Sequence, residues 1–218
     1  AGHRDQKFIC YPIRREADGR MLTNWIAEMR VDPAAGFGRE DWNREADRSA
    51  FLPHFEAWNW GWLDVPGLIR GAERVMEYPM VDRDPLERWS EGRVTLLGDA
   101  AHPMYPIGSN GASQAVLDAR QLALHLARTP HVEQALAAYE AARRPPTAKL
   151  TLANRALGPE LILEEVHRRA PHGFTDLDTV ISRRELEDTA MNYKRLAGFD
   201  PALLNDRESW SVPRGVGP

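Results

Sequence analysis

The sequence has very little cysteine and no long apolar run. Cys10 is its only cysteine, so no disulfide can form within the chain, which suits a reducing compartment. No apolar run approaches the length needed to cross a bilayer, and the opening residues AGHRDQKF carry no apolar signal-peptide core. We therefore expect a soluble cytoplasmic protein that has no membrane as its partner.

Strong positive charge and metal-ligand spacing are also missing. The formal net charge is −4, so no basic field attracts nucleic acid. The seven histidines lack the spacing that is typical of a metal site, and we predict no metal. The glycine fingerprint G-x-G-x-x-G does not occur, so the sequence holds no complete dinucleotide-binding βαβ unit.

What remains is an ordinary globular composition that changes along the chain. The 218 residues are 43% hydrophobic and 28% charged, which supports a buried core in one large domain or two small ones. Six of the seven tryptophans precede residue 90, together with the strand signals, whereas helical periodicity dominates after residue 92. The sequence therefore predicts an α+β fold.

Two apolar runs near the start predict a β-hairpin. KFICYPI (7–13) and MLTNWIAEM (21–29) combine β-branched and aromatic residues. Asp18-Gly19 lies between them and is a strong turn signal.

Two further segments of the first part carry proline within a regular pattern. Residues 40–58 predict a helix that is interrupted near Pro53. Residues 74–84 predict a strand, with Pro79 at an edge position or a bulge. The alternating tryptophans of segment 58–62 favour one face of an extended segment, packed in the core rather than stacked on a ligand.

The second part is predicted to be mostly helical. Apolar residues recur at helical spacing over 112–126, and Pro130 marks the end of that helix and the start of the next. Pro145-Pro146 is expected to kink or break the second helix, and a further segment runs from about Thr147 to Leu157, where Gly158-Pro159 stops it. SRRE (182–185) is a capping-box pattern that opens another helix, to about Ala197.

Several charged residues of this part have structural interpretations. Arg143 and Arg144 precede the proline pair, where cations suit the dipole of a helix end. We expect His102 to bond the backbone and hold its loop rather than to act in catalysis. Residues 82–84 predict a solvated turn with a local ion pair.

A short connector, LLGDAAHPMYPIGSNGASQAVLDA (96–119), concentrates the residues that carry chemistry. Residues 92–97 predict a strand, and Asp99 follows at its carboxyl end, where α/β folds bind ligands. A carboxylate at this place can accept hydrogen bonds from the hydroxyls of a ligand.

The later half of the connector controls the backbone. Gly108 and Gly111 let the chain pass close to a flat or bulky group. Ser109 and Asn110 are good N-cap residues for the following helix, whose start offers free N–H groups and the positive end of a dipole. A ligand with a polyol chain and a ring that becomes anionic would use both halves, and reduced flavin is such a ligand.

The connector resembles the second flavin-contact motif of the class A flavoprotein aromatic hydroxylases, the para-hydroxybenzoate hydroxylase group. The matching positions are Gly98, Asp99, Ala100, Ala101, His102, Pro106, Gly108, Gly111 and Asp118. Within the group, YPMVDRDPLERW (78–89), DWN (41–43) and YEAARRP (139–145) resemble the phenazine-modifying type, 5-methylphenazine-1-carboxylate 1-monooxygenase. This similarity covers residues 1 to about 160.

The resemblance implies FAD as cofactor and NAD(P)H as co-substrate. It implies O₂-dependent hydroxylation of an aromatic, phenazine-type substrate through a flavin C4a-hydroperoxide. We assign no residue of this sequence as a catalytic acid or base. The implied cofactor-binding residues are Gly98, Asp99, Ala100, Pro106, Gly108, Ser109, Asn110, Gly111 and Ala112. The implied substrate-binding residues are Tyr78, Pro79, Met80, Tyr11, Trp25 and Pro106.

The family also begins with G-x-G-x-x-G and carries a central Asp-Gly motif, and this sequence has neither. The resemblance therefore implies the C-terminal part of such an enzyme. Residues 1–90 would be the end of its substrate-binding sheet domain, 91–158 the end of its FAD-binding domain, and 159–218 a helical extension and tail.

Two functions stay open at this point: part of a flavin-dependent monooxygenase, or an inactive remnant that retains only its fold and partner contacts. Apolar surface left by a missing N-terminal portion would favour self-association or binding of that portion.

Overall fold

The computed structural model describes residues 1–32, 34, 41–78 and 80–212. The chain divides into two compact units, Ala1–Pro79 and Met80–Pro218. Strands and helices are both present, as the α+β prediction requires. The division at 79/80 precedes the predicted boundary at 90/91, and it leaves residues 91–212 in one unit. The roles assigned to the three predicted domains stay predictions.

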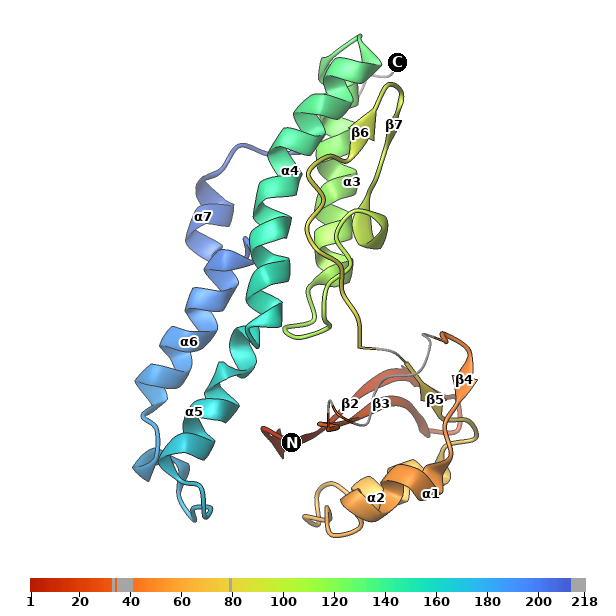
Figure 1. The fold of residues 1–218 in the computed structure, drawn as a ribbon, viewed down its shortest axis with the longest axis vertical. Helices are drawn as coiled ribbons and strands as arrows, with labels where there is room; N and C mark the ends of the chain where they lie inside the picture. Colours follow the sequence, from red (N-terminus) through yellow and green to blue (C-terminus); the bar gives the residue numbers. More distant parts are fainter. Residues whose placement is uncertain (33, 35–40, 79, 213–218) are drawn as a thin grey trace. The chain divides into compact units, whose positions relative to one another are not determined.

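The first unit is built on the predicted hairpin (Figure 1). Strands β2 (Gln6–Arg15) and β3 (Met21–Met29) pair antiparallel, and β1 (Gly2–His3) extends the sheet in the order β1-β2-β3. Gly19 has a φ of 86° in the connecting turn, a backbone angle that glycine adopts without steric cost. The hairpin prediction is confirmed.

The two faces of this hairpin differ. Phe8 is buried with Phe55, Val65 and Ile69, and Val65–Gly71 forms α2 beneath the sheet. The other face is apolar but exposed, and its exposed side chains are Ile9, Tyr11, Ile13, Leu22 and Ile26.

The segment 40–58 is less helical than its sequence predicts. Of the described residues 41–58, only α1 (Arg48–Phe51) and the 3₁₀ helix η2 (Leu52–Phe55) are helical, because the Asp47 cap starts the helix late and Pro53 tightens it. Arg44–Glu45 forms strand β4 instead, and it pairs with β5 (Met76–Glu77).

The predicted strand 74–84 is therefore reduced to two residues, and Pro79 lies outside the described residues. The tryptophan prediction is also wrong in part. Trp60 and Trp62 are 45% and 77% exposed because their segment turns on the Asn59–Asp64 bridge and they stack on each other there.

The second unit opens with a small hairpin, β6 (Ser90–Glu91) and β7 (Val94–Thr95). The strand predicted over 92–97 is therefore shorter than expected, with only the two residues of β7. It pairs antiparallel with β6 because Gly92 lies in the turn between them. The 3₁₀ helix η3 (Gly98–Ala100) follows.

Two long helices form the body of this unit. Helix α3 (Gly111–Arg128) and helix α4 (Val132–Arg155) lie side by side (Figure 1). The buried core around them includes Trp89, Ala101, Leu124, Leu136, Tyr139 and Leu150.

Pro145 and Pro146 do not break α4, so the break, one of the two predicted outcomes, is wrong. Both prolines are exposed, and the carbonyls that lose an amide partner belong to the exposed residues Ala141 and Ala142. Water can bond these carbonyls, which lowers the cost of a proline pair within a helix that is held by packing on its other face.

The chain ends in shorter helices. These are η4 (Gly158–Glu160), α5 (Leu161–Arg169), η5 (Leu177–Thr179), α6 (Arg183–Leu196) and α7 (Pro201–Asp206). The capping box at Ser182 and Glu185 is present as predicted. Among the helices that the structure describes, none is long and apolar enough to cross a membrane.

Candidate functional site

The connector runs from η3 to the start of α3. Gly98 is buried with a φ of 59°, and a Cβ there would lie 3.2 Å from the Cβ of Ala115. The backbone therefore passes α3 at a distance that suits glycine. This contact positions the backbone of Asp99, whose side chain is exposed.

Asp99 lies next to the first turn of α3. A Cβ built on Gly111 would lie 3.8 Å from Oδ1 of Asp99. The side chain of Asn110, the N-cap residue, makes no capping hydrogen bond, so it does not cover the N–H groups of Gly111 and Ala112. An exposed carboxylate and an open helix N-terminus thus lie together, which the spacing of the connector predicted.

Asn110 is the N-cap residue of α3, as predicted, but neither its side chain nor that of Ser109 caps the helix. Asn110 instead donates from Nδ2 to the carbonyl of Gly108 at 2.9 Å and to the hydroxyl of Tyr193 at 2.8 Å. Ser109 has a φ of 53° and is exposed. The loop geometry therefore uses both residues and leaves the helix start free.

A buried charged cluster, formed by Gly98, His102, Gln114, Asp118 and Arg143, lies beneath the connector. Asp118 is fully buried and accepts three hydrogen bonds: from Gly98 N–H (3.1 Å), His102 Nε2 (2.5 Å) and Arg143 Nε (2.6 Å). Burial alone raises the pKa of Asp118, but the hydrogen bonds and charges of His102 and Arg143 outweigh it and hold this pKa below its usual value.

The charged cluster links the connector to both long helices. Arg143 Nη2 donates to Oε1 of Gln114 at 2.6 Å, and Gln114 Nε2 donates to the carbonyl of Ala197 at 2.8 Å. Arg143 is buried in the middle of α4, so its predicted role at a helix end is wrong. His102 does hold the loop, through the carboxylate of Asp118 as well as through its own backbone N–H to Gly98 O (2.9 Å).

A second, neutral cluster holds the other side of the connector, and we call it the tyrosine clamp: Tyr105, Gly108, Asn110, Asn154 and Tyr193. Asn154 Nδ2 donates to the carbonyl of Tyr105 at 3.1 Å, and Tyr193 donates to Asn154 Oδ1 at 2.7 Å. Asn154 is fully buried. Burial raises the pKa of the Tyr193 hydroxyl, which keeps it a neutral donor.

The predicted ion pair of residues 82–84 is not local. Asp82 and Asp84 both bind Arg155 at the end of α4, at 2.5 and 2.7 Å. These bonds tie the segment that precedes the connector to the C-terminal end of α4.

The cofactor-binding residues predicted from the resemblance lie together in the second unit. Those that are exposed are Asp99, Ala100, Pro106, Gly108, Ser109 and Ala112. Gly98 and Asn110 are buried and Gly111 is half-buried, so they shape the loop from below.

The predicted substrate-binding residues are distributed over both units. Tyr11, Trp25 and Tyr78 belong to the first unit, whereas Met80 and Pro106 belong to the second. Tyr11 and Tyr78 are 50% and 61% exposed. Trp25 faces the core, where its ring lies 5.7 Å from that of Phe8, so it shares no face with Tyr11.

The part that four residues play at the site was not predicted from the sequence: Gln114, Arg143, Asn154 and Tyr193. The available signal was polarity on an otherwise apolar helix face, since Gln114 and Asp118 are four residues apart and both are buried. Tyr193 carries no local signal, because it reaches the loop from 83 residues away.

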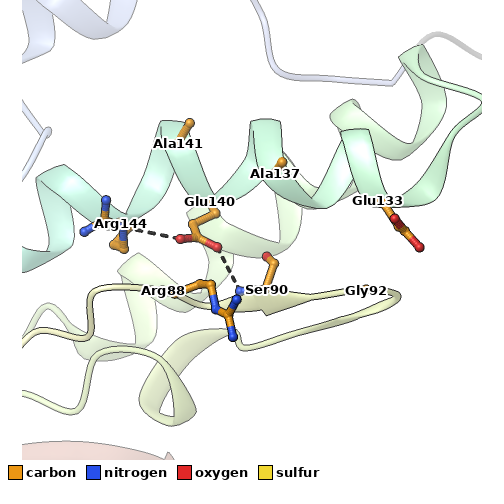
Figure 2. Close-up of a pocket in the computed structure, with 8 residues that line it drawn as sticks. All are labelled: Arg88, Ser90, Gly92, Glu133, Ala137, Glu140, Ala141 and Arg144. Carbon is orange, nitrogen blue, oxygen red and sulfur yellow. Dashed lines mark hydrogen bonds and ion pairs between the residues drawn. The ribbon is translucent and has the colours of Figure 1, made fainter.

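A separate hollow of about 340 Å³ lies between the β6–β7 hairpin and α4 (Figure 2). Its lining residues are Arg88, Ser90, Gly92, Glu133, Ala137, Glu140, Ala141 and Arg144. Glu140 accepts from the Ser90 N–H at 2.8 Å and pairs with Arg144 at 3.4 Å, so its charge is already occupied. Among the described residues, no group of three or more His, Cys, Asp or Glu side chains could hold a metal ion.

Comparison with known proteins shows similarity to flavin-binding proteins. Residues 71–154 match the family model described as an FAD binding domain. The solved salicylate hydroxylase substrate complex superposes with a TM-score of 0.57 at 23% identity, over 92% of this chain and 46% of that one. The crystal structure of FqzB superposes with a TM-score of 0.52 at 25% identity, over 96% and 47%.

Two curated relatives are monooxygenases or hydroxylases of aromatic compounds. The phenazine 1,6-dicarboxylic acid hydroxylase PhzS of Lysobacter antibioticus is 50% identical over 155 residues, 70% of this chain and 38% of the relative. The 3-amino-4-hydroxybenzoate 2-monooxygenase PtnB3 of Streptomyces platensis is 35% identical over 198 residues, 90% of this chain and 46% of the relative.

The chain is therefore similar to FAD-dependent aromatic monooxygenases, and the resemblance predicted from the connector is confirmed. Within that group it is similar to a phenazine hydroxylase. It spans less than half the length of the relatives named here.

Proposed function

We propose that residues 98–112 hold FAD and that the chain is part of a monooxygenase that hydroxylates an aromatic ring with NAD(P)H and O₂. The observation that carries the proposal is the exposed carboxylate of Asp99 beside the uncapped N-terminus of α3. The match of residues 71–154 to an FAD binding domain supports it.

The residues present fit FAD. The Asp99 carboxylate would accept hydrogen bonds from the ribityl hydroxyls. The N–H groups of Gly111 and Ala112, with the positive end of an 18-residue helix, would bind the pyrimidine edge, which gains negative charge on reduction. Gly108 shapes the loop between these groups, since a Cβ there would lie 2.2 Å from the Tyr193 hydroxyl. The bound cofactor supplies hydride acceptance from NAD(P)H and the activation of O₂.

For the substrate we propose a phenazine-type aromatic. Support comes from the 50% identity to a phenazine 1,6-dicarboxylic acid hydroxylase. Tyr11, Tyr78, Met80 and Pro106 remain the proposed contacts, whereas Trp25 packs within the first unit. A benzoate-type substrate is the second candidate, since the PtnB3 relative acts on 3-amino-4-hydroxybenzoate. We keep a cytoplasmic location as a prediction.

The first experiment is a visible absorbance spectrum of the purified chain after addition of excess FAD and desalting. A retained flavin spectrum is expected. Replacement Asp99→Asn should weaken FAD binding about tenfold to a hundredfold, because hydrogen bonds to a charged group contribute about 1.5–3 kcal/mol. Asp188→Asn removes an exposed carboxylate of α6 and should leave binding unchanged.

Loss of flavin from the unmodified chain on desalting would overturn the proposal for this chain. It would favour the remnant, which keeps its fold and partner contacts only. The exposed apolar face of β2 and β3 is the surface on which such a partner would be sought.

A further inference from the structure

We infer that Tyr193 of α6 is a positioning residue for the loop 105–110, which belongs to the proposed FAD site. The helical extension after residue 158 therefore takes part in cofactor binding without contacting the cofactor. The inference rests on the proposed function. Residues 159–218 lie outside the matched FAD binding domain, and nothing in that match assigns them a role.

The hydroxyl of Tyr193 closes a continuous chain of hydrogen bonds around the loop. Asn110 Nδ2 donates to the hydroxyl at 2.8 Å, and the hydroxyl donates to Asn154 Oδ1 at 2.7 Å. Asn154 then donates to Tyr105 O, and Asn110 donates to Gly108 O. The carbonyl of Ile107, at 3.2 Å, is a second acceptor for the Tyr193 hydroxyl. The hydrogen-bonded chain therefore ends on carbonyls of the loop itself.

The backbone of the loop is shaped to receive the Tyr193 ring. A Cβ at Gly108 would lie 2.2 Å from the Tyr193 hydroxyl, and one at Gly158 would lie 2.9 Å from its Cε2. Both glycines also have positive φ, 78° and 45°. Tyr193 therefore occupies space that two glycines leave open, on the side of the loop that faces the helices.

A second contact fixes α6 against α3. The carbonyl of Ala197, at the end of α6, accepts from Nε2 of Gln114 at 2.8 Å. Gln114 lies in the first turn of α3, so α6 contacts α3 on both sides of the helix start: through Asn110 before it and Gln114 within it. The open N–H groups are held between these two contacts.

Removal of the Tyr193 hydroxyl should loosen the loop specifically. In Tyr193→Phe the ring still fills the space, but the buried Asn154 Oδ1 loses the hydroxyl that donates to it, and Asn110 Nδ2 keeps only its bond to Gly108 O. A loop that is no longer held in one conformation must be ordered when the cofactor binds, which weakens binding.

The matched control is Tyr139→Phe. Tyr139 is fully buried and its hydroxyl donates to the carbonyl of Leu96 at 3.1 Å, outside the tyrosine clamp. Both variants delete one phenol hydroxyl that donates to a partner within the second unit, so a general loss of stability would affect both.

Two measurements on the full chain test the inference. Hydrogen–deuterium exchange without FAD should become about tenfold faster at the amides of residues 105–113 in Tyr193→Phe and stay unchanged there in Tyr139→Phe. The Kd for FAD, from flavin fluorescence, should rise about tenfold in Tyr193→Phe and stay unchanged in Tyr139→Phe.

Unchanged loop exchange in Tyr193→Phe, or equal effects of the two variants, would overturn the inference. If the unmodified chain binds no FAD, the proposed function fails, and the exchange result alone decides whether Tyr193 holds the loop. If Tyr193→Phe does not fold, exchange in the unmodified chain under mild denaturant decides it: α6 and residues 105–113 should open together, and opening of α6 alone would refute the clamp.

Discussion

The charged cluster and the tyrosine clamp hold the same connector in opposite ways. The charged cluster buries a carboxylate and a guanidinium and joins Gly98 to α3 and α4. The tyrosine clamp is neutral and joins the loop 105–110 to α4 and α6. A buried ion pair is expensive to leave half-made, whereas a neutral chain of hydrogen bonds breaks at lower cost. The part of the connector next to Gly98 is therefore held by charged groups, whereas the loop 105–110 is held by neutral groups.

The largest expected effect is loss of the Arg143 charge. Arg143→Met leaves the Asp118 carboxylate buried with His102 as its remaining ionisable partner, and we expect a loss of about 3–5 kcal/mol in the free energy of unfolding. Urea denaturation followed by circular dichroism measures it.

The neighbouring residue provides the control. Arg144 is half-exposed and pairs with Glu140 on the same helix, so Arg144→Met should cost less than about 1 kcal/mol. Equal losses in unfolding free energy in the two variants would mean that the charged cluster contributes no more to stability than an ordinary surface ion pair.

The next effect tests how tightly the clamp fits. Gly108→Ala places a Cβ against the Tyr193 hydroxyl, and it should cost about 1–2 kcal/mol for the positive φ plus about 1–3 kcal/mol for the contact. Gly19→Ala has a similar φ and no atom within 4 Å of its Cβ, so it should show the backbone cost alone. Thermal unfolding of both variants measures the difference, and equal losses would mean that Tyr193 does not press on the loop.

The smallest effect is the pH dependence of the charged cluster. The pKa of Asp118 is lower in the folded chain than its unfolded value of about 3.9, so its contribution to stability is present above about pH 4. That contribution disappears as the pH falls through the folded pKa. Unfolding free energies measured from pH 5 downward should therefore decline less steeply in Asp118→Asn.

Two partly exposed carboxylates also have lowered pKa values and serve as the reference. The pKa values of Glu165 and Glu185 are held to about 2 by hydrogen bonds, first from Arg168 and Arg169 respectively. Glu165→Gln removes one of them without touching the charged cluster. If it flattened the decline as much as Asp118→Asn does, the buried site would have no special part in acid stability.

Local signals predicted the local features of the fold. The Asp18-Gly19 turn, the periodic segment after residue 110 and the capping box at Ser182 each depend on residues a few positions apart, and the structure has all three. The connector motif was equally readable because its fixed positions lie within one continuous stretch of sequence.

Features that depend on distant contacts could not be predicted. Pro145-Pro146 forbids a helix by local rules, but α4 continues because its opposite face is packed and its unpaired carbonyls reach water. The sequence predicts that Arg143 is a cation at a helix end, because its contact with Asp118 cannot be seen from neighbouring residues. Tyr193 reads as an ordinary residue of an amphipathic helix, because its partners are 39 and 83 residues away.

These separations along the chain have a consequence for the order of folding. The three hydrogen bonds to Asp118 close loops of 16, 20 and 25 residues, so the α3–α4 pair can form while the rest is unfolded. The clamp must wait for α6 to dock. Arg143→Met should therefore slow refolding, whereas Tyr193→Phe should leave refolding unchanged and speed unfolding, and stopped-flow kinetics with the reverse pattern would refute this order. The loop that would receive the cofactor is then the last part of its unit to acquire its shape and the first to lose it.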